Sequence, residues 1–484
     1  MGPDAIPFQF GCPGHVSRRQ FLAGCTACAA GMSAVNLGAS MASAAAVAQT
    51  SQPAVAGKPR VRLVFSHTNP DQPCWPNIGY DFEKRKTELI EQFRQKCPNV
   101  EFLPQTVQTA DEAKKLLAAD KDIDGYLVYL VGMWTGVPAA IIGSGKPTIM
   151  VDDLYAGSGE FLIAYSGAKR AGAKVVGVSS TKFDDVVEAV RCFECMKKLQ
   201  ASRLLVFATW DIAEIGKHVQ GTFGTTVIQP AIDELNAAYD KADRDEARKI
   251  AQAWMKGAEK IVEPSAEEIE KSAAMSIAMR DLMQHYDARA ITIACLHMFY
   301  GKKMFAYPCM GFWQLNNDGY VGACEADIRS AITMLAMSYL TGRPGYISDP
   351  VIDTSKNQII YVHCVAPTKV FGPNGPTNPY HIRSHSEDRK GACVRSLMPL
   401  GEMTTTILFE PTRKEMIIHQ GKTVENVDED KACRTKLAAE VADARKLLTE
   451  WDRWGWHRVT FYGDLRNQVE NLCTLMGIKV VQEG

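Results

Sequence analysis

The chain has 484 residues, of which 46% are hydrophobic and 23% are charged, and its formal net charge is -1. A single hydrophobic core stops growing at about 250–300 residues, so this length predicts two or three domains. The balanced charge leaves no basic excess for a phosphate backbone, so we expect no nucleic-acid partner.

The N-terminal region carries the features of an export signal. Residues 17–22 read SRRQFL, which fits the twin-arginine pattern, and a weakly hydrophobic stretch rich in Ala and Gly follows to Ala48. We therefore predict a twin-arginine signal peptide over residues 1–48 and delivery to the periplasm. The sequence LAGC at 22–25 resembles a lipobox, so a lipid anchor at Cys25 is the alternative.

A polar linker over residues 49–59 precedes a first doubly wound α/β domain, which we place at 60–173. Apolar strand patterns and amphipathic helix patterns alternate in it. The expected strands are 61–65, 100–102, 125–131 and 147–151, and the expected helices are 82–97, 110–119 and 135–142. This alternation predicts βαβ units around a parallel sheet.

The same alternation resumes in a second α/β domain, placed at 174–350. Its expected strands are 174–178, 203–208 and 290–295, and its expected helices are 184–199, 233–261, 265–286 and 325–340, with a loop at 310–322. Strand patterns dominate in residues 351–484. The predicted fold is therefore α/β, with two Rossmann-like parallel-sheet domains followed by a β-rich C-terminal domain.

Several common classes of protein are disfavoured by what the sequence lacks. No stretch of 18 apolar residues follows Ala48, so no transmembrane anchor is expected. Neither a G-x-G-x-x-G turn nor a P-loop follows a predicted strand, which argues against a nucleotide site. The 14 cysteines include three in the signal, and the odd remainder with scattered spacing does not predict a disulfide framework.

Three residues with metal-binding side chains stand where loops meet regular elements. Glu325 begins an apolar helix pattern, Asp349 ends a strand pattern before Pro350, and His457 lies close to the last strand pattern. Two carboxylates and an imidazole suit Mn²⁺, Mg²⁺ or a similar ion better than a Cys-rich structural zinc. Taken alone, Glu325 also fits a helix N-terminal carboxylate favoured by the helix dipole.

At these positions the chain resembles the L-fucose isomerase family, with L-arabinose isomerases as more distant relatives. The resemblance is closest over residues 300–484. It is carried by CEAD at 324–327, DP at 349–350, YVHC at 361–364, RSH at 383–385, CRT at 433–435, and His457 with YGD at 462–464. It implies that Glu325, Asp349 and His457 hold a manganese-type ion in an oligomeric, metal-dependent aldose–ketose isomerase.

Isomerisation of an aldose to a ketose moves a proton between neighbouring carbons through a cis-enediol. A divalent ion stabilises the developing oxyanion, and carboxylates on opposite sides of the C1–C2 bond act as base and acid. We therefore predict catalytic roles for Glu325 and Asp349, a divalent cofactor, most simply Mn²⁺, and a small sugar as substrate.

A cluster just before Glu325 is predicted to bind that substrate. Trp313, Gln314 and Asn316 combine an aromatic side chain with amides, which suits the C–H faces and hydroxyls of a sugar.

Three further residues are predicted substrate contacts. His363 lies in an apolar strand pattern, where a hydrogen-bonded core histidine is the alternative. His385 lies in a polar loop, where it could face a polyol. The family resemblance implies that residues of the first domain reach a neighbouring subunit's site, which suggests Trp75, together with His67, as a contact in trans.

Two other classes of function remain open on the sequence. One is an exported, non-catalytic sugar-binding protein, against which the complete Glu–Asp–His set argues. The other is a carboxylate-based hydrolase or lyase acting on carbohydrate. Glycosidases generally use two carboxylates without a metal, which leaves His457 with no part in that scheme.

Overall fold

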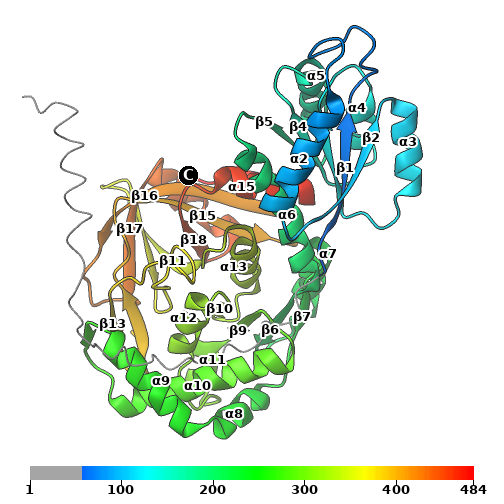
Figure 1. Ribbon diagram of the computed structural model, residues 1–484. Helices are drawn as coiled ribbons and strands as arrows, with labels where there is room; N and C mark the ends of the chain where they lie inside the picture. The colour runs from blue at the N-terminus through cyan, green and yellow to red at the C-terminus, as the bar shows by residue number, and fades with distance from the viewer. Residues whose placement is uncertain (1–56) are drawn as a thin grey trace, which may run out of the picture. The chain divides into compact units, whose positions relative to one another are not determined.

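The computed structural model describes residues 57–484, so the predicted signal peptide, Cys25 and most of the predicted linker lie outside the described residues. The strands form sheets of five, four, seven and three strands (Figure 1). Among the helices of residues 57–484, none combines the length and apolarity required to cross a membrane.

The first sheet is parallel throughout, in the order β2-β1-β3-β4-β5. Its strands are β1 (Arg60–Ser66), β2 (Glu101–Val107), β3 (Gly125–Leu130), β4 (Thr148–Asp152) and β5 (Val175–Ser179), and its helices are α2 (Phe82–Lys96), α3 (Ala110–Ala119), α4 (Val137–Ile142) and α5 (Ser158–Arg170). Strands β3 and β4 are buried along their whole length, as is usual for a parallel sheet covered on both faces. The predicted βαβ units are confirmed, but β5 pairs with β4, so this sheet runs past the boundary placed at residue 173.

The second sheet is also parallel, in the order β10-β9-β6-β7. Its elements are α6 (Phe183–Ala201), β6 (Arg203–Phe207), α7 (Ala213–Phe223), β7 (Thr226–Ile228), α8 (Ile232–Lys241), α9 (Arg244–Gly257), α10 (Ala266–His285), β9 (Ala290–Ile293), α11 (Cys295–Tyr300), α12 (Cys309–Asn317), β10 (Val321–Cys324) and α13 (Ile328–Thr341). The loop predicted at 310–322 is wrong, because most of it is α12, a largely buried helix that packs against α10.

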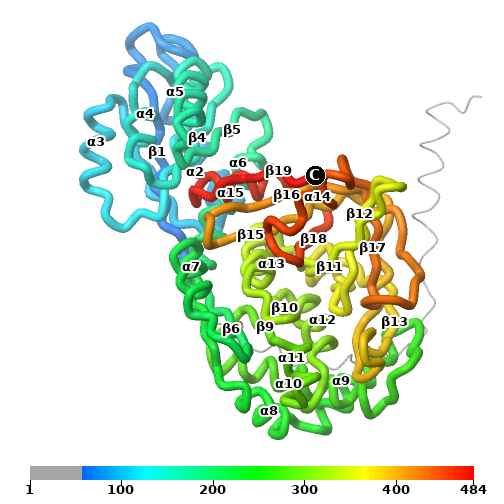
Figure 2. The backbone as a smooth tube through the Cα atoms, turned by 180° about the vertical axis from the view of Figure 1, so that it is seen from behind, coloured from blue at the N-terminus to red at the C-terminus, as the bar shows by residue number. Residues whose placement is uncertain are grey.

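The C-terminal strands close into an antiparallel barrel, as seen from behind in Figure 2. The order β15-β18-β11-β12-β17-β16 is closed by a pairing of β16 with β15. The elements are β11 (Tyr346–Asp353), β12 (Gln358–His363), β15 (Met403–Glu410), β16 (Glu415–Asn426), β17 (Thr435–Val441), α14 (Ala444–Glu450), β18 (Arg458–Tyr462), α15 (Arg466–Met476) and β19 (Lys479–Gln482). The predicted β-rich region is confirmed, but it begins before residue 351, because β11 carries Asp349.

A small sheet outside the barrel joins the second α/β region to the C-terminal region. It has the order β14-β13-β8, from β8 (Lys260–Ile261), β13 (Tyr380–Arg383) and β14 (Cys393–Ser396). Strand β8 pairs in parallel with β13, so a segment that follows α9 is tied directly to the chain that leaves the barrel.

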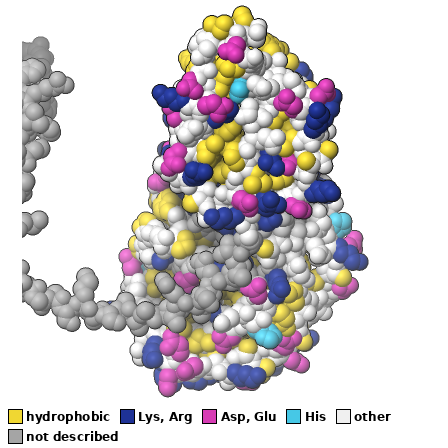
Figure 3. Space-filling view, turned by 45° about the vertical axis from the view of Figure 1, so that its right-hand side comes forward, with side chains coloured by type: hydrophobic (Ala, Val, Ile, Leu, Met, Phe, Trp, Pro, Cys, Tyr) yellow, Lys and Arg dark blue, Asp and Glu magenta, His cyan; other side chains and the backbone are white. Residues whose placement is uncertain are grey.

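The cysteines of the described chain are free thiols, and nine of the eleven are buried. Cys192 and Cys195 lie inside α6 and are fully buried, and the thiol of Cys195 donates to the carbonyl of Ala336 in α13 at 3.3 Å. Their C-x-x-C spacing therefore serves helix packing. On the face drawn in Figure 3, Lys and Arg side chains are interspersed with Asp and Glu side chains, in keeping with the near-zero net charge.

Candidate active site

Four titratable side chains meet where the second sheet adjoins the barrel. Glu325 directly follows β10, Asp349 lies in β11, His363 ends β12, and His457 directly precedes β18. Nε2 of His457 lies 3.1 Å from Oδ1 of Asp349 and 3.5 Å from Oε2 of Glu325. Nε2 of His363 lies 3.6 Å from Oε1 of Glu325. The structure thus brings the three predicted metal ligands together and adds one predicted substrate contact, His363.

Glu325 sits in a turn, which the sequence did not indicate. The predicted helix starts at Glu325, but α13 begins at Ile328, with Asp327 as its N-cap. Glu325 and Ala326 have φ values of 63° and 52°, in the left-handed region that non-glycine residues seldom occupy. Backbone strain of this kind clusters at functional sites, where the surrounding structure holds it in place. The interpretation of Glu325 as a helix N-terminal carboxylate is therefore wrong.

Asp327 fixes the orientation and tautomer of His457. Its Oδ2 lies 3.0 Å from Nδ1 of His457, so Nδ1 carries a proton and its N–H donates a hydrogen bond to the carboxylate. Nε2 of His457 is buried and has no hydrogen-bond partner among the described residues. A carboxylate behind an imidazole is the usual support of a metal-binding histidine. Once Nε2 gives up its proton, His457 is thus oriented to offer a lone pair to a cation.

His363 is prepared for the opposite role. Its Nδ1 accepts the backbone N–H of Cys364 at 3.0 Å, so the neutral ring carries its proton on Nε2. This Nε2 is also buried without a hydrogen-bond partner in the described chain. An N–H at this point can donate to Glu325 or to a substrate oxygen. His363 therefore fits a donor better than a metal ligand.

The ionisation states follow from burial and from these neighbours. Burial alone would lower the pKa of His457, but Asp327 and Asp349 raise it to about 10. Burial opposes ionisation of Glu325 and Asp349 as well, yet His363 and His457 hold both carboxyl pKa values below their usual range. The pKa of Asp327 is lowered to about 2, because its hydrogen bond to His457 outweighs the effect of burial. At neutral pH without a metal, the site therefore holds three carboxylates and a protonated His457.

The donor set fits a divalent cation. The ligand atoms of Asp349, His363 and His457 all lie within 4.8 Å of one another, and so do those of Cys324, Glu325 and His363. Two carboxylates held ionised leave excess negative charge beside Nε2 of His457, and a borderline divalent cation would displace the proton of that nitrogen on binding. Glu325, Asp349 and His457 are the residues that could hold it.

Trp456 is a feature of the site that the sequence analysis missed. Its indole N–H donates to Oδ1 of Asp349 at 2.6 Å, while 61% of the residue is exposed. Asp327 was quoted within the CEAD motif but given no role. Two sequence features could have identified these residues. Trp456 directly precedes His457, and Asp327 directly precedes the apolar helix pattern.

The cluster predicted before Glu325 uses its polar groups within the fold. The indole N–H of Trp313 donates to Thr368, and Oε1 of Gln314 accepts the indole N–H of Trp254 at 2.8 Å. The Asn316 side chain bonds both backbone groups of Gly322, at 2.9 and 3.0 Å. No hydrogen bond or ion pair within residues 57–484 joins Trp313, Gln314 or Asn316 to Glu325, and their contact with a substrate stays a prediction.

His385 and Trp75 make no hydrogen bond or ion pair to Glu325 or Asp349 among the described residues. His385 is buried, with Nδ1 3.2 Å from Oδ1 of Asp388 and its ring packed near Tyr307. Trp75 lies in the loop after β1 and is 49% exposed. Its predicted contact in trans concerns another subunit and stays a prediction.

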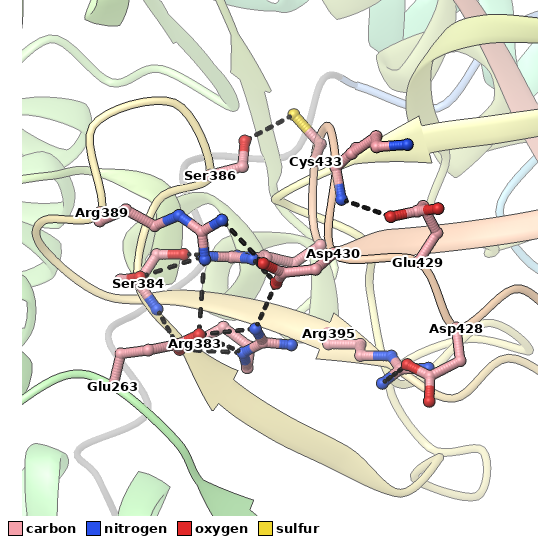
Figure 4. A network of polar contacts seen from close by, with 12 residues as sticks. Glu263, Arg383, Ser384, Ser386, Arg389, Arg395, Asp428, Glu429, Asp430 and Cys433 are labelled. Carbon is pink, nitrogen blue, oxygen red and sulfur yellow. Dashed lines mark hydrogen bonds and ion pairs between the residues drawn. The ribbon is translucent and has the colours of Figure 1, made fainter.

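Near His385, an ionic network holds the end of β13 (Figure 4). Arg383 lies 2.6 Å from Glu263 and 3.1 Å from Asp430, and Arg389 lies 2.7 Å from Asp430. Because each of these guanidinium groups has a carboxylate partner, the network ties the loop that carries Asp430 to β13.

Comparison with known proteins points to sugar isomerases. Sulfoquinovose isomerases from Priestia aryabhattai and Priestia megaterium are each 24% identical over 286 residues, which cover 55% of this chain and 63% of theirs. That of Clostridium sp. (strain MSTE9) is 24% identical over 273 residues, or 53% of this chain and 58% of its own. The chain therefore spans about three fifths of the length of these curated relatives.

These homologues refine the family resemblance. They belong to an aldose–ketose isomerase family that is related to, but not the same as, the L-fucose isomerases. No family model matches the chain. A solute-binding protein of an ABC transporter from Burkholderia multivorans aligns with 58% of this chain and 93% of its own at 10% identity, but its TM-score of 0.18 carries no argument.

Proposed function

We propose that this protein is an aldose–ketose isomerase whose proton transfers are made by Glu325 and Asp349. The observation that supports this proposal is that the carboxylates of Glu325 and Asp349 face the buried Nε2 of His457 at 3.5 and 3.1 Å, and that this nitrogen makes no hydrogen bond within residues 57–484. The homologous sulfoquinovose isomerases support the same class of reaction.

Glu325, Asp349 and His457 would hold the divalent cation, for which Mn²⁺ suits the carboxylate and imidazole ligands. When bound, such an ion supplies Lewis-acid stabilisation of negative charge on the substrate oxygens. The protein contributes the rest of the arrangement. Asp327 keeps the proton of His457 on Nδ1, and the left-handed turn at Glu325 aims that carboxylate towards His457.

The two carboxylates then act as base and acid on the sugar. Their lowered pKa values keep both ionised at neutral pH, so each is available to remove a proton from the carbon beside the carbonyl. Removal of the C2 proton and protonation of O1 give the cis-enediol, and the ketose forms when C1 gains a proton and O2 loses one, so no net proton is gained or lost. A positioned proton transfer contributes ~10²–10⁴-fold to the rate. The Nε2–H of His363 would donate to a substrate oxygen and limit the charge that builds up there.

The substrate in this proposal is a small sugar. Sulfoquinovose belongs in any panel because the relatives carry its name, and L-fucose and L-arabinose belong because of the motifs at 324–327 and 361–364. We further propose that the protein is exported by the twin-arginine route and assembles as a homo-oligomer, with the signal peptide and the family resemblance as support.

The deciding experiment combines metal analysis of the purified protein with a panel of aldoses scored for ketose formation. We expect ketose from at least one aldose, loss of activity with a chelator and recovery with Mn²⁺. The matched control is Glu325→Gln, which keeps the side-chain size but removes the charge. Activity that survives chelation would instead favour a carbohydrate hydrolase, and binding without turnover would favour a sugar-binding protein.

The route of the proton is tested in deuterated water. Proton transfer through a cis-enediol places deuterium at C1 or C2 of the product. If no label enters and a C2 deuterium of the aldose is found at C1 of the ketose, the reaction is a hydride shift. Glu325 and Asp349 would then be ligands without acid and base roles.

A further inference from the structure

Trp456 is an exposed aromatic side chain with a fixed orientation beside the candidate site. The residue is 61% exposed, yet its indole N–H donates to Oδ1 of Asp349 at 2.6 Å. A large exposed aromatic residue usually needs no explanation when it stands alone. This one bonds to a carboxylate of the site and directly precedes His457.

The backbone on either side of this ring is also held firmly. The carbonyl of Trp456 accepts the indole N–H of the buried Trp451 at 2.8 Å. Nη1 of Arg458 donates to the carbonyls of Gly455 and His457, at 3.1 and 2.9 Å. Arg458 is itself fully buried and paired with Glu483. The ring is therefore presented to solvent by a preorganised loop, which lowers the entropy lost when a ligand packs against it.

The same indole distinguishes the two oxygens of Asp349. Oδ1 accepts the Trp456 N–H and lies 3.1 Å from Nε2 of His457. In the described chain no hydrogen bond is made to Oδ2. The indole thus fixes the rotation of the carboxylate and leaves Oδ2 as the oxygen available to a substrate.

We propose that Trp456 positions Asp349 through its N–H and binds the apolar C–H face of the sugar substrate on its exposed ring. Aromatic rings combine a large apolar face with a polar edge, and here the edge is anchored to the carboxylate that moves the proton. Packing a sugar on this face would place its reacting carbons close to Oδ2 of Asp349. Trp456 is then a positioning residue and a determinant of which sugar face is accepted. This inference rests on the isomerase function proposed above.

Two substitutions separate the two roles. Trp456→Phe keeps an aromatic face but removes the N–H, so kcat should fall ~10–100-fold, the range for a hydrogen bond to a charged group, while KM changes little. Trp456→Ala removes the face as well, so KM should also rise, by up to ~10-fold. The control is Trp134→Phe, because Trp134 is equally exposed, at 61%, and lies in the first α/β region. It should leave both constants unchanged.

A merely structural role for Trp456 would alter Tm without this split between kcat and KM. The inference is overturned if Trp456→Phe retains full kcat, or if Trp456→Ala retains the KM of the original protein. Binding of unreactive alditols, followed by calorimetry, keeps the test separate from the proposed reaction. If the protein turns over no aldose, the isomerase proposal fails. Binding of sugar to the exposed ring of Trp456 is then tested by alditol binding alone. Loss of alditol binding in Trp456→Ala supports sugar binding on this ring. Unchanged binding in the variant, or no binding by the original protein, refutes it.

Discussion

Oδ2 of Asp327 lies 3.0 Å from Nδ1 of His457, although 130 residues separate the two in the chain. The same carboxylate caps α13 by accepting the backbone N–H of Ser330. One side chain therefore fixes the start of a helix and the tautomer of the imidazole at the candidate metal site.

Replacing Asp327 by Asn should separate these two tasks. Asn is as good an N-cap as Asp, so the free energy of unfolding should change little. Its amide can turn an N–H towards Nδ1 of His457, which would favour the wrong tautomer and weaken metal binding ~10–100-fold. Calorimetric titration with Mn²⁺ measures the effect, with Ser330→Ala as the control for the local bonds. Binding at full strength in Asp327→Asn would show that this contact does not support a ligand.

Glu325→Gln and His457→Ala should fail in different ways. The first removes an anionic ligand and a proton-transfer group together, so turnover should fall by orders of magnitude that excess Mn²⁺ does not restore. The second should act mainly through metal affinity, so excess Mn²⁺ should recover part of the activity. Steady-state assays across a Mn²⁺ series distinguish them. Full activity with full metal content in His457→Ala would refute its assignment as a ligand.

The sequence predicted the elements of the fold better than their closure. Period and composition located the five strands of the first sheet and β6 and β9 of the second, because both depend on residues close together in the chain, but they missed β7 and β10. The barrel depends on pairing of β15 with β18 and of β12 with β17, which no local pattern specifies. This is why Asp349 was assigned to the second α/β domain and not to the barrel.

The candidate site shows the same limit at the level of single residues. Glu325, Asp349 and His457 were found because their chemistry and motif spacing are visible in the chain. Trp313 was predicted to contact substrate from its type alone, but whether an indole N–H is already used inside the fold depends on tertiary contacts. Trp456 was missed for the converse reason, because its partner Asp349 is distant in sequence.

Glu483 is predicted to stabilise the barrel strongly. It is almost fully buried, pairs with Arg458 at 2.6 Å and lies 3.0 Å from Nδ1 of His419. Glu483→Gln would leave the Arg458 charge buried without its counter-ion, which costs ~3–5 kcal/mol for such pairs. Urea unfolding at pH 7 measures this loss. Lys479→Ala, which breaks an exposed pair with Glu415, should cost less than ~1 kcal/mol and serves as the control.

Export is predicted to depend on the two arginines of the SRRQFL sequence. Replacing Arg18 and Arg19 by Lys should retain the protein in the cytoplasm, because both guanidinium groups belong to the recognised pattern. Fractionation of cells that carry the full chain, with an antibody against the protein, measures its location. The control is Lys58→Arg, a basic substitution inside the predicted linker at 49–59 and outside the signal peptide. Undiminished delivery of the double variant would contradict the twin-arginine assignment.

The pH dependence of stability in the metal-free protein is predicted to report His457. Its folded pKa is raised from 6.5 to about 10 by Asp327 and Asp349. A raised pKa means that the folded state holds the proton more tightly than the unfolded state, so the contribution is fully present below about pH 6.5 and is lost as pH rises towards 10. The free energy of unfolding should therefore fall over this window in the presence of a chelator.

Mn²⁺ should reverse that trend, because it competes with the proton for Nε2 of His457 and binds more tightly as the proton leaves. Urea unfolding at pH 7 and pH 9.5, with chelator and with excess Mn²⁺, tests both halves of the argument. His457→Ala should lose most of the slope in chelator, whereas His218→Ala, on the partly exposed face of α7, should retain it. If the metal-free protein is equally stable at both pH values, then Asp327 and Asp349 do not hold a proton on His457, and the charge balance inferred for the site is wrong.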